Sequence, residues 1–274
     1  MKPIAVTTPD GLTIAAGEWG NPTGPEIVFI HGFCQSALSW TRQLADPALA
    51  AEFRMVAYDL RGHGASDKPT ATEHYTDDRR WADELAAVIA AAGMKRPVLV
   101  GWSYAGRVIT DYVRTHGPGG IAGINFVAAL AKTDAAQFGP GGRHLPGMLS
   151  DDLATNIEAT RGFLRACFEK QPNADEFETM LAFNMVIPPR VREALRSRTA
   201  NPGDLLPTLR LPVLVTHGVL DQLVLVGMAR SVAATVPGAK LSVYDGIGHA
   251  PFFEDAARFN RELAAFVRAA AKKS

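Results

Sequence analysis

Short apolar runs alternate with amphipathic stretches along most of the chain. Apolar runs without an alternating polar face are typical of strands that are buried on both faces of a parallel sheet. Six runs have this character: residues 27–30, 55–58, 98–100, 124–128, 213–216 and 241–244. The clearest helical pattern covers residues 78–92, where Leu85, Val88, Ile89 and Ala92 recur at helical spacing. Because strands and helices alternate, the pattern predicts an α/β protein with a doubly wound sheet.

The beginning and the end of the chain add further elements. Residues 4–8 and 12–19 are β-like runs on either side of an Asp-Gly step, which is a strong turn signal, so a hairpin is predicted at the start. A helix is expected to begin just after Ser103 and to end near residues 116–118, where a Gly-Pro step follows a histidine. A last helix is expected over residues 253–270.

The alternation stops between residues 132 and 207, where the sequence is helical and loop-like and has no β-run. We therefore predict an insertion over residues 132–207 and a core made of residues 1–131 and 208–274. The insertion has an apolar set, namely Phe163, Leu164, Phe168, Met180, Leu181, Phe183 and Met185. We expect most of these side chains to pack against the main domain and the rest to line a pocket.

Composition excludes several classes of protein. The 274 residues are 47% hydrophobic and 20% charged, which are values of a folded globular chain. Lys plus Arg and Asp plus Glu balance at 28 each, so we expect no nucleic-acid partner and no attraction to an anionic membrane. Cys34 and Cys167 are too few for a disulfide framework. The N-terminus lacks a signal-peptide pattern and no apolar run could span a bilayer, so a cytoplasmic location is expected.

Candidate chemistry begins at Ser103, which lies between a predicted strand and a predicted helix in the segment Gly101-Trp102-Ser103-Tyr104-Ala105-Gly106. This is the outline of a nucleophile elbow, in which a tight turn exposes the serine hydroxyl and needs small neighbours. Gly101 and Ala105 meet that need, although the usual pattern has glycine in place of Ala105. The alternative is an ordinary serine that caps a helix.

A serine hydroxyl needs a base to take its proton and an acid to hold that base. In the elbow fold these residues follow the serine in the order Asp or Glu, then His, on loops after later strands. Asp221 follows the run at 213–216, and His249 follows the run at 241–244. The sequence therefore predicts Ser103, Asp221 and His249 as a catalytic triad at the carboxyl edge of the sheet.

An oxyanion in acyl transfer needs preorganised N–H donors. The backbone amide after the nucleophile belongs to Tyr104. A second amide is expected from Phe33, because Gly32 lets the chain turn directly after the run at 27–30. The side chains of Phe33, Trp102 and Tyr104 are expected to wall the substrate pocket.

Other polar residues compete for these roles. Asp134 follows the run that ends near residue 128 and is an alternative acid, although Asp221 fits better. His63 lies in a turn between glycines, where we expect a structural role. Cys34 is expected to be a buried filler in preference to a reactive thiol. The other histidines have no partners at metal-ligand spacing, so we predict no metal site.

Five segments carry a resemblance to a known family: His31-Gly32-Phe33, Asp59-Leu60-Arg61-Gly62-His63-Gly64-Ala65-Ser66, Gly101-Trp102-Ser103-Tyr104-Ala105-Gly106, His217-Gly218 with Asp221, and Gly248-His249-Ala250-Pro251. With them the chain resembles α/β-hydrolases of the esterase, perhydrolase and lactonase-like group. The resemblance implies a mostly parallel eight-stranded sheet flanked by helices, with the insertion as a helical cap over the site. Related haloalkane dehalogenases and epoxide hydrolases carry Asp where this chain has Ser103, so neither activity is expected.

These observations predict a serine hydrolase that cleaves a small, predominantly apolar carboxylic ester or lactone through an acyl-enzyme on Ser103, without a cofactor. One alternative is a cofactor-free perhydrolase of the haloperoxidase type, in which peroxide replaces water. Another is a ligand receptor on the same fold with slow turnover. The expected partner is a small molecule, and the oligomeric state is left open.

The insertion also bears on specificity. We expect its apolar residues to enclose the acyl group together with the three aromatic residues near the serine. An alternative is that some of its arginines face inward and hold a carboxylate, although solvation on helix surfaces is favoured. These arginines are Arg161, Arg165, Arg190, Arg192, Arg196 and Arg198.

Overall fold

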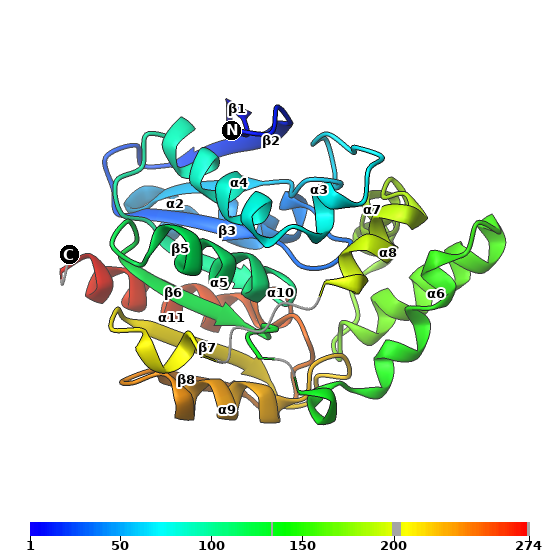
Figure 1. Cartoon of the computed structure of the whole chain (residues 1–274). Coiled ribbons are helices and arrows are strands. Elements are labelled where there is room, and N and C mark those ends of the chain that lie inside the picture. The colour runs from blue at the N-terminus through cyan, green and yellow to red at the C-terminus, as the bar shows by residue number, and fades with distance from the viewer. Residues whose placement is uncertain (133, 199–203, 273–274) are drawn as a thin grey trace.

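The structure is a computed structural model that describes residues 1–132, 134–198 and 204–272. In this part of the chain eight strands form one sheet in the order β1-β2-β4-β3-β5-β6-β7-β8 (Figure 1). β2 pairs antiparallel with β1 and β4, and the remaining neighbours pair in parallel. The predicted mostly parallel eight-stranded sheet is confirmed. The strands are β1 (Lys2–Thr7), β2 (Thr13–Gly20), β3 (Glu26–Ile30), β4 (Arg54–Tyr58), β5 (Val98–Trp102), β6 (Gly123–Val127), β7 (Val213–Gly218) and β8 (Lys240–Tyr244).

The predicted N-terminal hairpin is confirmed by β1 and β2. Its turn is closed by backbone hydrogen bonds from Gly11 to Thr8 and from Thr8 to Leu12, each 2.9 Å long. Gly11 has a φ of 82°, a conformation that only glycine adopts at little cost. The Asp-Gly signal in the sequence therefore had a direct physical basis.

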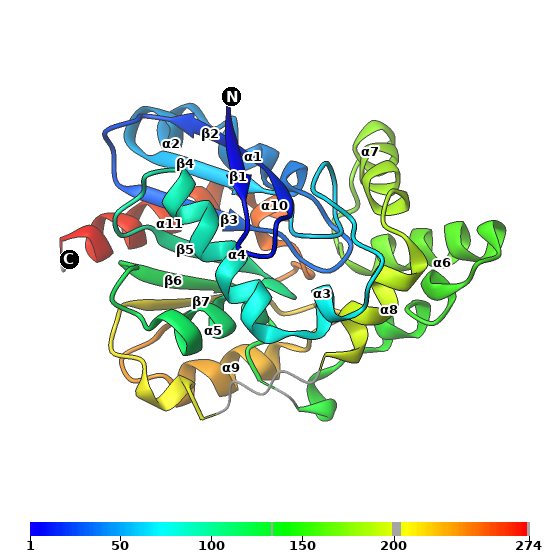
Figure 2. The same cartoon turned by 45° about the horizontal axis from the view of Figure 1, so that its top comes forward.

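Helices cover both faces of the sheet. α4 and α5 lie on one face, while α2 and α11 lie on the other, where Arg268 of α11 pairs with Glu52 of α2 (Figures 1 and 2). The amphipathic pattern of α4 is explained by its buried face, which includes Leu85, Val88 and Ile89. The helices of the core are α1 (Thr41–Leu44), α2 (Pro47–Glu52), α3 (Glu73–Thr76), α4 (Asp78–Ala91), α5 (Ala105–His116), α9 (Val226–Thr235), α10 (Pro251–Glu254) and α11 (Ala256–Ala271).

The C-terminal helix predicted over residues 253–270 is confirmed from residue 256 onward by α11, whereas residues 253 and 254 belong to the separate short helix α10. Asp255 separates them with φ −136° and ψ 61°, which are not helical values. Its side chain accepts a hydrogen bond of 3.3 Å from the backbone of Arg258 and so caps α11. A local side-chain cap thus competes with continuation of the helix, a preference that aspartate shows in general.

In its described residues, the insertion over residues 132–207 forms three helices and short 3-10 turns and contributes no strand to the sheet. The helices are α6 (Leu153–Ala166), α7 (Ala174–Met185) and α8 (Pro189–Ser197). They lie together beyond the carboxyl ends of the parallel strands (Figures 1 and 2). The division of the chain into a core and a cap stays a prediction, which this arrangement supports.

Arg192 holds the insertion together from inside. Its guanidinium is fully buried and donates to the carbonyl oxygen of Met148 at 3.0 Å, to Oδ1 of Asn156 at 2.9 Å and to the carbonyl oxygen of Asn184 at 2.7 Å. Met148 lies in a 3-10 turn, Asn156 in α6 and Asn184 in α7. Arg192 therefore links elements of the insertion to one another. The sequence pattern favoured a solvent-exposed position on a helix surface for this arginine, and the structure buries it instead.

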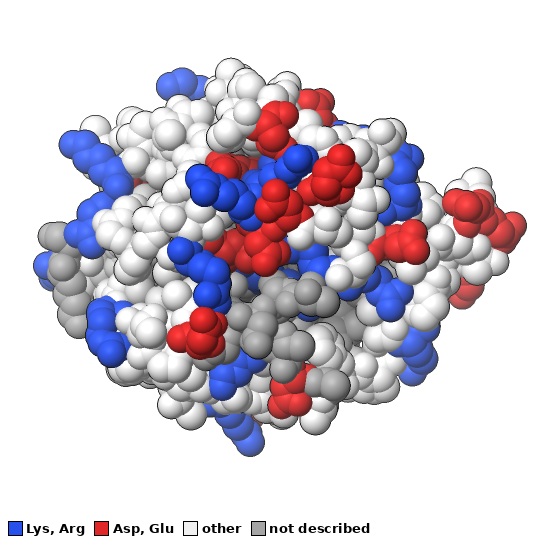
Figure 3. Space-filling model, in the orientation of Figure 1, with Lys and Arg blue, Asp and Glu red and all other residues white. Residues whose placement is uncertain are grey.

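Charged side chains of both signs are intermixed on the face shown in Figure 3. This mixture agrees with the balanced composition of 28 basic and 28 acidic residues. Among the helices of the described residues, none combines the length and the hydropathy that crossing a bilayer requires.

Candidate active site

Ser103 occupies a strained turn between β5 and α5. Its φ is 55°, in the left-handed region that non-glycine residues rarely adopt. The Ser103 amide donates to the carbonyl oxygen of Val127 at 2.9 Å, and the Ser103 carbonyl oxygen accepts from Gly106 at 3.0 Å and Leu130 at 2.9 Å. These bonds tie the turn to the end of β6 and to the loop that follows, so the neighbouring strand holds the strained conformation in place.

The small residues around this turn are required by close approach. A Cβ atom at Gly101 would lie 2.5 Å from Cδ1 of Ile109, and one at Gly32 would lie 3.1 Å from Cβ of Ser103. Both positions therefore leave little room for a side chain. Ala105 begins α5 and is fully buried, so its single methyl group fits where the usual pattern has glycine.

Asp221 and His249 follow β7 and β8 and meet at the same edge of the sheet. Nδ1 of His249 donates to Oδ2 of Asp221 at 2.7 Å, and both residues are buried. Oδ1 of Asp221 accepts from the amides of Leu223 at 2.8 Å and Val224 at 2.9 Å. This arrangement fixes the proton of His249 on Nδ1 and leaves Nε2 as an acceptor.

His217 is a further partner of Asp221 that the sequence reading missed. Its Nε2 lies 3.0 Å from Oδ2 of Asp221 and 2.7 Å from the carbonyl oxygen of Val224. Its Nδ1 is buried without a partner among the described residues, so the ring carries its proton on Nε2. The signal was present, because His217 and Asp221 lie four positions apart at the end of one strand.

The carboxyl group of Asp221 is ionised in this setting. Burial alone would raise the pKa of Asp221, but the electrostatic interaction with His249 and the hydrogen bonds from His217 and His249 hold that pKa well below its usual range. A buried carboxylate is stable only when its oxygens are satisfied. Here two side chains and two backbone amides satisfy them.

The loop of His249 is anchored to the insertion. The His249 amide donates to the carbonyl oxygen of Cys167 at 3.1 Å, just after α6. The carboxylate of Glu254 accepts from Gly248 at 3.1 Å on one side and from Glu169 at 3.0 Å and Lys170 at 2.9 Å on the other. The carboxylate of Glu254 thus fixes the loop of His249, called the histidine loop below, relative to the insertion.

Phe33 and Tyr104, whose amides are the predicted oxyanion donors, line the same cavity as Ser103. Within the described residues, neither backbone amide donates a hydrogen bond to another group. Cys34, next to Phe33, has a φ of 57°, so the loop after β3 is also held in a left-handed conformation. The two N–H groups are therefore free to bind an anionic oxygen.

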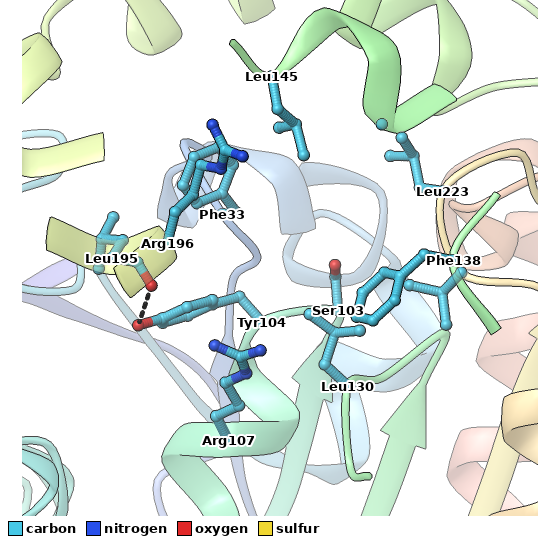
Figure 4. A pocket seen from close by; sticks show the side chains of 12 residues that line it. Phe33, Ser103, Tyr104, Arg107, Leu130, Phe138, Leu145, Leu195, Arg196 and Leu223 are labelled. Carbon is cyan, nitrogen blue, oxygen red and sulfur yellow. Dashed lines mark hydrogen bonds between the residues drawn. The ribbon is translucent and has the colours of Figure 1, made fainter. Parts of the chain in front are cut away.

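A cavity of about 280 Å³ opens in front of Ser103. The Ser103 hydroxyl points into it (Figure 4). The core and the insertion both contribute to its twelve lining residues, which are Phe33, Ser103, Tyr104, Arg107, Leu130, Phe138, Gly142, Leu145, Leu195, Arg196, Leu223 and Val224. Most of this lining is apolar.

Trp102 does not lie among these lining residues, contrary to the prediction that it walls the pocket. Its Nε1 donates to the carbonyl oxygen of His249 at 2.9 Å, and its ring packs against Phe252 with centroids 4.9 Å apart. Successive side chains of a strand point to opposite faces, so a residue next to Ser103 need not share its cavity. Trp102 supports the histidine loop instead.

Three residues that the sequence offered for other roles, namely Asp134, His63 and Cys34, do not line the cavity. Asp134 is exposed, and its carboxylate accepts from the amide of Ala136 at 3.0 Å. His63 is fully buried, with Nδ1 2.9 Å from the carbonyl oxygen of Arg61. Burial raises the pKa of the Cys34 thiol to about 12, which suits a buried filler. No cluster of three or more His, Cys, Asp or Glu within residues 1–132, 134–198 and 204–272 could hold a metal ion.

Comparison with known proteins gives related sequences and structures. Residues 27–262 match a family described as the alpha/beta hydrolase family. The non-heme chloroperoxidase of Streptomyces lividans is 30% identical over 282 residues, which cover 96% of this chain and 99% of that protein. The crystal structure of a proposed aryl esterase from Burkholderia cenocepacia is 40% identical, with a TM-score of 0.93, and covers 99% of this chain and 100% of that chain. An esterase structure from Rhodococcus sp. ECU1013 is 35% identical, with a TM-score of 0.91, over 98% of this chain and 99% of that chain.

The ionised carboxyl group of Asp221 leads to a prediction about stability. A group whose pKa is lower in the folded than in the unfolded state stabilises the protein above its unfolded pKa of about 3.9, and this contribution is lost as pH falls below that value. The difference in unfolding free energy between the wild type and Asp221→Asn should therefore be largest near neutral pH. It should shrink at acidic pH, by about 1.4 kcal/mol for each unit by which folding lowers the pKa. Urea unfolding across this pH range measures the difference, and a constant difference would contradict the assignment.

Proposed function

The chain belongs to the alpha/beta hydrolase family, and from this premise we propose that it is a serine hydrolase acting on a small, predominantly apolar carboxylic ester or lactone. The esterase and haloperoxidase relatives support a hydrolase or an esterase/perhydrolase function. The observation that carries the proposal is the strained Ser103 at an apolar cavity, combined with a buried Asp221–His249 pair 2.7 Å apart at the same edge of the sheet.

In the proposed first half-reaction, Oγ of Ser103 attacks the acyl carbon while Nε2 of His249 takes the hydroxyl proton. Asp221 keeps the other proton of the ring on Nδ1 and stabilises the imidazolium that forms. His249 then gives its proton to the leaving alcohol oxygen as the carbon–oxygen bond of the ester breaks. An acyl-enzyme on Ser103 and a free alcohol result; in a lactone, the alcohol stays attached to the acyl group.

The tetrahedral intermediate carries a negative oxygen that needs donors. We assign this role to the backbone N–H groups of Phe33 and Tyr104, because both lie at the cavity and have no other hydrogen-bond acceptor among the described residues. Donors that are fixed before the reaction stabilise the developing charge without reorganisation.

In the second half-reaction, water gives a proton to His249 and attacks the acyl carbon, and the carboxylic acid leaves as Ser103 regains its proton. Hydrogen peroxide in place of water would yield a peracid, and the 30% identity to a non-heme chloroperoxidase favours this as the second candidate activity. Neither half-reaction requires a cofactor. The expected partner is a small molecule, and the cytoplasmic location stays a prediction.

The insertion has a proposed role as a cap over this chemistry. Of the residues that line the cavity, it supplies Phe138, Gly142, Leu145, Leu195 and Arg196. Since both parts of the chain build the cavity, residues 1–131 and 208–274 would hold the reacting groups, and the cap would set the shape of the acyl group that fits.

Ser103→Ala should abolish both turnover of a simple ester and labelling by a fluorophosphonate probe, because it removes the attacking oxygen. Ser39→Ala is the matched control, since Ser39 and Ser103 are each 8% exposed. Active-site titration followed by steady-state assay measures both effects. Labelling of Ser103→Ala would overturn the nucleophile, and a burst of labelling without sustained turnover in the wild type would favour the receptor alternative.

Asp221→Asn should keep the fold and lower kcat by about 10⁴-fold, because the amide favours the wrong tautomer of His249. Asp134→Asn is the control, since Asp134 is exposed and bonds only to its own loop among the described residues. Steady-state esterase assays of both variants measure the change in kcat. If Asp134→Asn were the damaging change, Asp221 would not be the catalytic acid.

Acyl-chain length should affect kcat/KM until the cavity is full. Each methylene removed from water contributes about 0.8 kcal/mol, or about fourfold in rate. Leu145→Phe narrows the cavity and should move the optimum to shorter chains, whereas Leu153→Phe should leave it in place, since Leu153 is 64% exposed on α6. A series of ethyl alkanoates provides the measurement. An optimum that both variants shift equally would speak against the assigned cavity.

A further inference from the structure

The charges in the cavity are all of one sign. Of the twelve described residues that line it, Arg107 and Arg196 are the charged ones, and no acidic side chain is among them. Figure 4 shows Arg107 rising from α5 to a position beneath the ring of Tyr104, and Arg196 lines the same cavity from the end of α8. An apolar cavity with two guanidinium groups is therefore chemically suited to more than an apolar acyl chain.

Arg107 has no carboxylate in contact among the described residues. Its Nη1 donates to the carbonyl oxygen of Arg198 at 3.0 Å, and its guanidinium lies 5.6 Å from the centre of the Tyr104 ring. The acids whose charges act on Arg107, Asp78 and Asp111, are already engaged, because both pair with Arg198. The positive charge of Arg107 is thus not neutralised by a partner of its own.

The unused N–H donors of Arg107 have the geometry that a carboxylate requires. Nη1 of Arg107 is taken by the Arg198 carbonyl oxygen, which leaves Nε and Nη2 without acceptors among the described residues. These two N–H groups form one side of the guanidinium fork and match the two oxygens of a carboxylate.

The electrostatic setting favours an anion as well. Burial lowers the pKa of Arg107, and the positive charge of Arg198 adds to this effect. The protein therefore bears a cost for holding the charge in an apolar wall, and a bound anion would offset it. Arg196 is exposed and forms no ion pair with the described residues, so it is free to approach the same anion from the rim.

We propose that Arg107, assisted by Arg196, forms a carboxylate subsite, so that the preferred substrate is an ester or lactone with a carboxylate at the end of its apolar chain. The proposal rests on the hydrolase function proposed above. The apolar residues Leu130, Phe138 and Leu145 contact the methylenes, and the arginines bind the terminal charge. Substrate specificity then depends on the distance between the reacting carbonyl and the carboxylate.

The test compares kcat/KM for monoethyl esters of dicarboxylic acids with kcat/KM for ethyl alkanoates of the same chain length. The wild type should favour the charged series by about tenfold at the best length, as expected for a charge-assisted hydrogen bond. Arg107→Gln should bring the ratio of the two values close to one, and Arg107→Lys should restore part of it. Arg196→Gln should lower the ratio by a smaller factor.

Arg114→Gln is the matched control on the same helix, because Arg114 is exposed and pairs with Asp204 at 2.6 Å outside the cavity. It should keep the wild-type ratio. Thermal unfolding of each variant identifies a loss of folding, and the wild-type ratio itself does not depend on any variant. Turnover of the alkanoates without preference for the charged series overturns the subsite and leaves the hydrolase function standing. Absence of turnover in both series overturns the hydrolase function.

Discussion

The left-handed backbone of Ser103 is the constraint on which the geometry of the cavity depends. A non-glycine residue in this conformation costs about 1–2 kcal/mol, so its surroundings must enforce it. Hydrogen bonds to Val127, Gly106 and Leu130 do so, and the close packing at Gly32 and Gly101 leaves little room for a side chain at either position. The same turn starts α5, and it therefore also fixes where the first residues of that helix face the cavity.

The second fixed point is the buried charge of Asp221. Four donors surround its carboxylate, and they come from three places: the strand end at His217, the loop at Leu223 and Val224, and the loop of His249 after β8. A charge that is saturated in this way holds two loops together, since moving either loop would leave an unpaired buried group. The Asp221–His249 pair and the strained turn at Ser103 lie at the same edge of the sheet, because β5, β7 and β8 run parallel and these residues follow their carboxyl ends.

The sequence was informative where structure depends on short-range patterns. Apolar runs predicted the six strands β3 to β8, β-like runs around an Asp-Gly step predicted β1 and β2, and small residues at fixed spacing predicted the turn at Ser103. Features that depend on tertiary packing were not accessible in this way. The break at Asp255 is decided by one side-chain cap, and the position of Trp102 is decided by which face of β5 meets the histidine loop. Arg107 carried no signal, because its neighbourhood forms only when α5 and the end of α8 come together.

The hydrogen bonds between the histidine loop and the segment after α6 bear on how such a protein diversifies. Cys167 holds the backbone of His249, and Glu254 bridges the amides at Gly248 and Lys170. Insertions of this kind are natural places for lineages to acquire new specificities, because the sheet beneath is unaffected. In this chain such exchange is limited, because an exchanged insertion must reproduce the backbone path from Cys167 to Lys170 or displace the imidazole of His249. We therefore expect crossover points outside residues 167–170 to preserve the hydrogen bonds between the insertion and the loop of His249.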